Sequence, residues 1–221
     1  MKETIKEILS YCEAHANNRM ASQIKNKGAT EETIWGTPQK DLKKLYKKYV
    51  DNHELALELY KLDNLEARSL ATMIADLGKM DEKQFNEWIE LSDSFWLNNY
   101  QLSVTLAGHK DAQRIAMNWI KSDISKKVDA GFFTYCWLLG NRQDSQFTDE
   151  EIGALLSLVE SSENLSEGMK YFVEVVGISY IPLHDQAVKL AKERNIKTTT
   201  MGIEKAKEKG RLGFKRNYLR C

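Results

Sequence analysis

Residues 63–92 read DNLEARSLATMIADLGKMDEKQFNEWIELS and contain two helix starts in succession. In a capping box, a short polar side chain and a Glu or Gln three residues later satisfy free amides at a helix N-terminus. Asp63 with Glu66 and Asp81 with Gln84 both match this pattern. Apolar residues follow each start at helical spacing, so the stretch predicts two helices joined by a short connection.

Helical signals of the same kind continue along most of the chain. Thr148 with Glu151 is a third capping box, and Thr37 is an expected N-cap before Pro38 at the first helical position. With two prolines and abundant Leu, Ala, Lys and Glu, the composition favours an all-α chain. A loop is expected through Gly28 and Gly36. Helices are expected from Pro38 and near 3–16, 52–61, 64–77, 82–92, 94–107, 109–121, 126–140, 149–161, 167–180, 183–194 and 200–209.

The short connections between these helices indicate the architecture. Consecutive helices joined in this way pack as antiparallel pairs, and a run of pairs stacks into a solenoid. We therefore expect an all-α, HEAT-like repeat α-solenoid. A compact irregular bundle is the alternative, because no sharp sequence period is visible. Since no Pro/Ser-rich linker interrupts the chain, residues 1–221 are expected to form one domain with a basic C-terminal tail, 204–221.

The bulk composition excludes several classes of protein. The three cysteines, Cys12, Cys136 and Cys221, are far apart and form no Cys-x-x-Cys pair, which indicates free thiols and no structural zinc site. We expect neither a metal nor a cofactor. The N-terminus lacks the apolar core of a signal peptide, and no apolar run approaches a membrane span. A cytoplasmic protein without a membrane partner is expected.

Basic residues gather at the C-terminus of a chain whose formal net charge is zero. Residues 204–221 hold seven Lys and Arg against two acids, and they include Arg211, Lys215 and Arg216 near Phe214 and Tyr218. Basic side chains interleaved with aromatic rings suit phosphates and stacked bases. A solvated tail is the other interpretation.

A second basic cluster lies on the helix expected after Pro38. Its apolar residues fall on one face, and five lysines fall on the other: Lys40, Lys43, Lys44, Lys47 and Lys48. These lysines are candidates for contacts with the phosphates of a nucleic acid, and Lys25 and Lys27 are weaker candidates. The alternative is an ordinary solvated helix face.

Two aromatic stretches also stand out. In residues 93–100, DSFWLNNY, Trp96 and Tyr100 share a helical face, which is typical of a packed seam or of a cleft for a sugar or base. Residues 132–142, FFTYCWLLGNR, are apolar on nearly every side and predict a buried central helix with a cap at Gly140-Asn141. Arg142 at its end could serve the helix dipole or face a phosphate.

The chain resembles the DNA alkylation repair proteins of the AlkD-like type, bacterial alkylpurine DNA glycosylases built from HEAT-like repeats. The order and spacing of several segments carry this resemblance over most of the chain. Later segments look like those of one branch of that family. The segments are Gly36–Pro38, Leu65–Ala71, Phe85–Ile89, Phe95–Trp96, Tyr135–Arg142, Ile178–His184 and Gly210–Arg216.

The resemblance implies hydrolysis of the glycosidic bond of N3- or N7-alkylated purines. A carboxylate and aromatic faces would stabilise the positive charge that develops on the deoxyribose. Trp96 matches one catalytic aromatic residue, whereas Tyr100 stands where the family has its catalytic aspartate. Asp93 is a substitute carboxylate only in a shifted register. The second catalytic tryptophan would fall near 171–174, where no Trp occurs.

Three functions remain open from the sequence. The first is an alkylpurine glycosylase that acts on duplex DNA through Trp96. The second is a non-catalytic relative that binds DNA in a basic concave groove through the lysines and the tail. The third is a HEAT-type scaffold whose charged helices bind an acidic protein partner.

Overall fold

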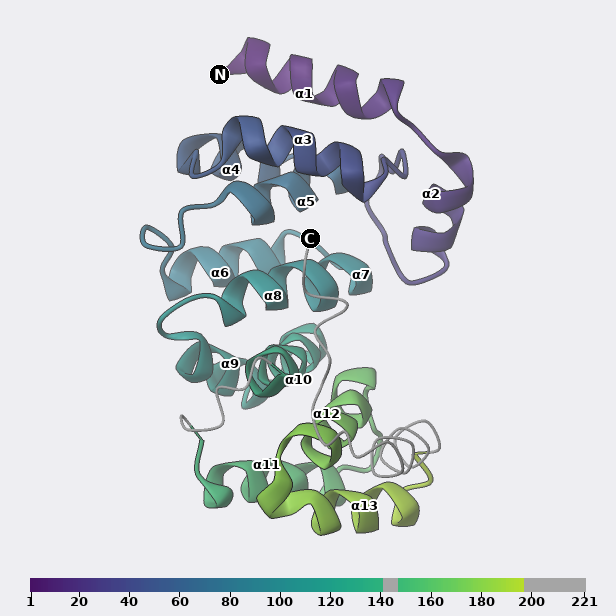
Figure 1. Ribbon diagram of the computed structural model, residues 1–221, viewed down its shortest axis with the longest axis vertical. Helices are drawn as coiled ribbons and strands as arrows, with labels where there is room; N and C mark the ends of the chain where they lie inside the picture. The colour runs from purple at the N-terminus through teal and green to yellow at the C-terminus, as the bar shows by residue number, and fades with distance from the viewer. Residues whose placement is uncertain (141–146, 197–221) are drawn as a thin grey trace. The chain divides into compact units, whose positions relative to one another are not determined.

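The computed structural model describes residues 1–140 and 147–196, and these ranges are helical (Figure 1). Their one bridge of the β type is isolated and joins Thr33 and Asn64. The all-α expectation is confirmed. The chain divides into two compact units, residues 1–112 and the residues from 113 on. No helix in the described ranges is long and apolar enough to cross a membrane. The single domain expected from the sequence stays a prediction.

The first unit is built of short helices that pack in groups. α4 packs against α5, α5 also contacts α1 and α3, and α6 contacts the π-helical segment η1. Leu55, Leu59 and Leu70 are fully buried between these helices. The elements are α1 (Lys2–Ala14), α2 (Asn18–Lys25), α3 (Gln39–Tyr49), α4 (His53–Tyr60), α5 (Leu65–Ile74), α6 (Glu82–Glu90), α7 (Phe95–Leu97), η1 (Asn98–Leu102) and α8 (Ser103–Ala107).

In the second unit, α10 is the central element. All its residues from Ala130 to Gly140 are buried, as the sequence predicted. It packs extensively against α12, where the rings of Phe132 and Phe172 lie 5.4 Å apart. Asn141 of the expected cap and the expected helix 200–209 lie outside the described residues. The elements are α9 (Ala112–Ile120), α10 (Ser125–Gly140), α11 (Asp149–Ser161), α12 (Glu167–Ser179), η3 (Ile181–Leu183) and α13 (His184–Glu193).

The predicted helix starts are confirmed at two places. Asp81 Oδ1 accepts from the Gln84 amide at 2.8 Å, and Gln84 Oε1 accepts from the Asp81 amide at 3.1 Å, which completes a capping box. Thr148 caps α11 through the amide of Glu151. These partners lie within one turn of each other, so local sequence suffices to find them.

The box predicted at Asp63 is wrong. Asn64 caps α5 instead, because its Oδ1 accepts from the Ala67 amide at 2.8 Å. Asp63 pairs with Arg68, and Glu66 turns to a distant loop. The helix begins one residue later than the pattern indicated.

Two further expectations near the N-terminus are corrected. The segment expected as loop contains α2, which Asn17 caps through the amide of Met20. Thr37 is not an N-cap, because its Oγ1 donates to the Cys12 carbonyl, and α3 begins after Pro38. Both differences arise from contacts that dock the loop before α3 onto α1 and α2.

Candidate nucleic-acid interface

A cavity of about 220 Å³ lies in the first unit and is lined by α2, the loop before α3, α3, α5, α7 and η1. Its lining combines apolar, amide, hydroxyl and charged side chains. The apolar ones are Met20, Ile24, Leu42, Leu65 and Trp96. The uncharged polar ones are Gln23, Thr37, Gln39, Ser69 and Gln101. The charged ones are Lys27 and Glu66.

Glu66 holds one wall of the cavity in place. Its carboxylate accepts from the amides of Trp35 at 3.2 Å, Gly36 at 2.7 Å and Thr37 at 3.2 Å. The residue is 2% exposed. Burying a carboxylate without hydrogen-bond donors is unfavourable, and these amides supply the donors. Glu66 therefore fixes the loop before α3, and three of its roughly four acceptor positions are already used.

Gly36 lets the same loop approach α2 closely. It has φ of +71°, and a Cβ there would lie 2.4 Å from Ala21 N and from Asn17 O. The Trp35 carbonyl accepts from the Asn17 amide at 2.9 Å. Because any side chain at Gly36 would strike the backbone of α2, the close approach of this loop to α2 depends on glycine there.

Trp96 enters the cavity from α7, which Ser94 caps. The neighbouring Phe95 amide donates to the Gly28 carbonyl at 2.8 Å, which brings this segment against the turn that follows α2. That turn carries Lys27, whose Nζ lies 5.1 Å from the centroid of the Trp96 ring. An ammonium at this distance is attracted to the ring by a cation–π interaction.

Tyr100 packs beside Trp96 but does not line the cavity. Their ring centroids are 5.0 Å apart, so the shared face predicted from their spacing is confirmed. Tyr100 lies on η1, a π-helical turn, and is 38% exposed. Asp93 is exposed, precedes the cap of α7 and is also absent from the lining. Of the three predicted catalytic residues, only Trp96 lines the cavity.

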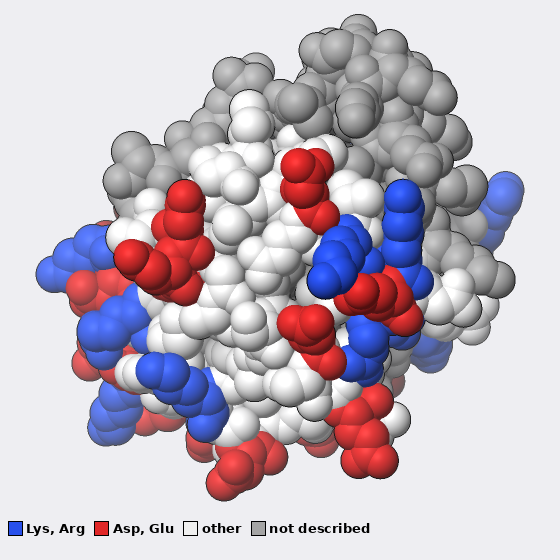
Figure 2. Space-filling view, turned by 90° about the horizontal axis from the view of Figure 1, so that it is seen from below, with Lys and Arg blue, Asp and Glu red and all other residues white. Residues whose placement is uncertain are grey.

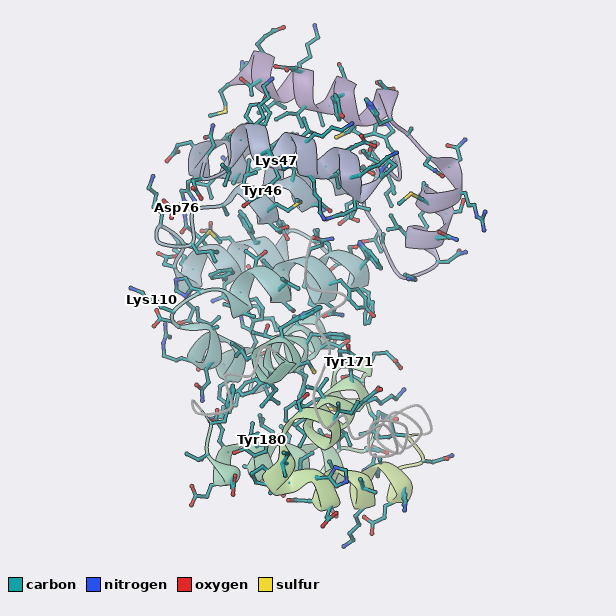
Figure 3. The ribbon with its side chains drawn as sticks, in the orientation of Figure 1. Tyr46, Lys47, Asp76, Lys110, Tyr171 and Tyr180 are labelled. Carbon is teal, nitrogen blue, oxygen red and sulfur yellow. The ribbon has the colours of Figure 1, made fainter. Side chains whose placement is uncertain are left out.

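The lysines of α3 differ in their partners. Lys44 pairs with Asp41 at 2.9 Å, and Lys48 pairs with Glu7 of α1. The hydrogen bonds to these acids raise the pKa of both lysines. Lys47, which lies beside Tyr46 (Figure 3), forms no ion pair with another described residue. The same holds for Lys40 and Lys43 in this part of the chain. Among the lysines of α3, Lys40, Lys43 and Lys47 are therefore the ones without an ion pair to a described residue.

The remaining predicted contacts are scattered or lie elsewhere. Lys25 is exposed on α2 outside the cavity lining. On the face shown in Figure 2, basic and acidic side chains of described residues are interspersed without a continuous basic band. Four predicted DNA contacts lie outside the described residues: Arg142, Arg211, Lys215 and Arg216.

The second unit holds the segment where the resemblance placed a second catalytic aromatic residue. Tyr171 lies there on α12 (Figure 3) and stacks on Phe133, with 5.4 Å between ring centroids. Burial raises the pKa of the nearby Glu174 carboxyl. Tyr171 is thus part of the contact between α10 and α12.

Comparison with known proteins adds the family. A family model described as "DNA alkylation repair enzyme" matches residues 8–168. The chain belongs to the DNA alkylation repair enzyme family. The resemblance read from the sequence is thereby confirmed, and the match includes the whole cavity and all of α3.

This member of the DNA alkylation repair enzyme family is similar to a solved structure over nearly its full length. The description of that structure reads "A new family of proteins related to the HEAT-like repeat DNA glycosylases with affinity for branched DNA structures". It is 35% identical with a TM-score of 0.89, and the match covers 98% of this chain and 99% of the other. The predicted HEAT-like repeat fold is therefore confirmed, and the alternative, a compact irregular bundle, is not the fold of this chain.

Two Listeria proteins are more distant relatives, and most of their length matches this chain. "Uncharacterized protein Lin0241" of Listeria innocua is 24% identical over 193 residues. "Uncharacterized protein Lmo0209" of Listeria monocytogenes is 23% identical over 193 residues. Each match covers 86% of this chain and 85% of the relative.

The sequence did not single out the amides of the cavity. Gln23, Gln39 and Gln101 come from α2, α3 and η1, and no local motif joins them. The one usable signal was the aromatic stretch around Trp96. Lys27 was only a weak candidate, because its relation to Trp96 exists in the folded chain alone.

Proposed function

We propose that this protein binds DNA at branched structures and does not excise alkylated purines. One observation carries the second half of this proposal, the absence of excision: the Lys27 ammonium lies over the face of Trp96. In the chemistry that the family resemblance implies, this aromatic face would stabilise the positive charge that develops on the deoxyribose. A like charge about 4 Å away would instead cost about 1 kcal/mol in water and about 4 kcal/mol at an effective dielectric of 20.

The acidic residue that lines the cavity also argues against excision of alkylated purines. Glu66 is the one acid among the lining residues, and its oxygens accept three backbone amides. Tyr100 stands where the family has its catalytic aspartate. Losing one electrostatic group at a charged transition state costs about 10²–10³ in rate in other enzymes. DNA binding needs no such carboxylate.

The basic residues and the structural relative support DNA as the ligand. Lys40, Lys43 and Lys47 form an unpaired row on α3 within the described part of the chain, and such rows contact phosphates. The 35% identical structure is described as having affinity for branched DNA. We extend that affinity to this protein and assign phosphate contacts to the three lysines.

Alkylpurine glycosylase activity is the second candidate. Membership of the DNA alkylation repair enzyme family and the position of Trp96 in the cavity favour it. It requires that Lys27 leave the ring when a cationic base arrives. The two candidates differ in whether the protein releases a base.

Fluorescence anisotropy with a labelled four-way junction and a linear duplex of the same arm sequence tests the proposal over a range of salt. We expect at least about tenfold tighter binding of the junction, and an affinity that falls steeply with salt because phosphate contacts release counterions. Equal affinities for the two DNAs would contradict branch recognition. Absence of binding to either DNA would contradict the proposal and leave the scaffold function.

A further inference from the structure

One residue that lines the cavity carries a hydrogen-bond donor that the described protein residues do not use. Gln39 begins α3 and lines the cavity, and its Nε2 is buried with no hydrogen-bond partner among the described residues. A buried donor without an acceptor is unfavourable. The geometry of Gln39 therefore suits a ligand that brings an acceptor atom into the cavity.

Lys27 supplies the charge for such a ligand. Its side chain is exposed and lines the same cavity, and no described acidic side chain lies within ion-pair distance of its Nζ. The cation–π contact with Trp96 holds the ammonium over the ring and leaves its hydrogens available. This arrangement selects an anionic group at the mouth of the cavity.

The size and lining of the cavity narrow the ligand further. About 220 Å³ corresponds to about seven molecules of liquid water, which suits one base with part of its sugar. Leu42 and Leu65 offer apolar contact, and the side chains of Gln101 and Ser69 offer donors and acceptors. A base carries carbonyl or ring-nitrogen acceptors, and such an acceptor is the partner that Gln39 Nε2 lacks.

We infer that this cavity binds one unpaired nucleotide at a DNA branch. Lys27 Nζ pairs with the phosphate of that nucleotide, and Gln39 Nε2 donates to an acceptor on its base. Trp96 positions Lys27. The inference rests on the proposed branched-DNA binding and adds the feature of the branch that the first unit recognises.

The test uses the full chain and three labelled three-way junctions: fully paired, with one unpaired nucleotide at the branch, and with an abasic unit in place of that nucleotide. Anisotropy at fixed salt should show about tenfold tighter binding of the unpaired nucleotide than of the paired junction, the scale of one charge-assisted hydrogen bond. The abasic junction should lose most of the gain.

Substitutions test whether the tighter binding of the junction with an unpaired nucleotide comes from the cavity. Lys27→Gln and Gln39→Glu should each remove most of the gain, the second because it exchanges a donor for an acceptor of the same shape. Lys25→Gln is the matched control, since it removes a charge from the same segment outside the cavity. Thermal unfolding of each variant verifies that the fold is retained.

The outcomes separate this inference from the proposed function. Junction binding that is equal for the three DNAs, or equally affected by Lys27→Gln and Lys25→Gln, overturns the inference and leaves branch binding intact. Failure to bind any junction overturns the proposed function itself. Deoxyadenosine monophosphate that quenches tryptophan fluorescence only when Lys27 is present, without a junction preference, would assign the cavity to free nucleotides and overturn the DNA assignment.

Discussion

Lys27 Nζ lies 5.1 Å from the centroid of the Trp96 ring, close enough for a cation–π interaction. The contact depends on the turn after α2, where Gly28 has φ of +85° and its carbonyl accepts from the Phe95 amide. A Cβ at Gly28 would lie 2.8 Å from Phe95 Cβ. The backbone thus places a cation against Trp96.

Neutralising Lys47 should weaken DNA binding more than neutralising its neighbour Lys48. Both are exposed on α3, but Lys48 is paired with Glu7. Lys47→Gln should reduce the slope of log K against log salt by about 0.9, the value for one phosphate contact. Lys48→Gln should change it less. Equal slopes for the two variants would exclude a specific contact by Lys47.

Glu66→Gln should destabilise the first unit. The substitution removes the charge and turns one acceptor into a donor that faces backbone amides. We expect the free energy of unfolding to fall by about 2 kcal/mol or more, since hydrogen bonds to charged groups contribute about 1.5–3 kcal/mol each. Urea unfolding measures the loss. Glu32→Gln, at an exposed site nearby, should stay within about 0.5 kcal/mol of the parent. A similar free energy of unfolding for Glu66→Gln and Glu32→Gln would show that the hydrogen bonds from the loop amides contribute little.

Two glycine substitutions should have opposite signs. Gly36→Ala forces a Cβ into the backbone of α2 at positive φ, and should cost about 2 kcal/mol or more. At Gly153 in α11, a Cβ would meet only Leu183 Cδ1 at 3.9 Å, so Gly153→Ala should stabilise by about 0.5–1 kcal/mol. Thermal unfolding of the parent protein and of the two variants measures both changes in stability. A neutral Gly36→Ala would mean that the loop can move away from α2.

Stability should fall in alkaline solution through Cys12. Burial, aided by the charge of Glu66, raises the pKa of its thiol from the ordinary 9.0 to about 12. Between these values the unfolded thiol ionises while the folded one keeps its proton. The free energy of unfolding therefore falls by up to about 1.4 kcal/mol per pH unit for this group.

Urea unfolding between pH 8.5 and 10.5 measures that slope, and Cys12→Ala should make it shallower. The comparison uses slopes, so the cavity left by the smaller side chain does not affect it. Burial also raises the pKa of Cys136, which remains in both proteins. Identical slopes would show that Cys12 ionises as readily in the folded protein as in the unfolded chain.

The sequence predicted those features whose partners lie within one helical turn. The box of Asp81 and Gln84 and the contact of Trp96 with Tyr100 are both of this kind. Glu66 was misassigned because its partners are loop amides about 30 residues away. A local pattern cannot distinguish a capping carboxylate from one that a tertiary contact has taken.

The site was only partly predictable for the same reason. α2 was missed because it is mostly polar, and Ala21 is its one buried residue. Without that helix, the sequence gives no reason to place Lys27 near Trp96 or to join Gln39 to the same cavity. The aromatic stretch indicated a site, whereas its chemistry follows from loop docking at Gly28 and Gly36.

Base release from alkylated DNA is the most direct test of the claim that this protein does not use Trp96 to excise alkylated purines. Protein whose DNA binding has been verified is incubated with duplex DNA that contains 7-methylguanine, and free base is measured against a protein-free control. We predict no release above that control, because Lys27 covers the ring and Glu66 is held by amides. Release that disappears in Trp96→Ala would contradict the claim and establish a glycosylase.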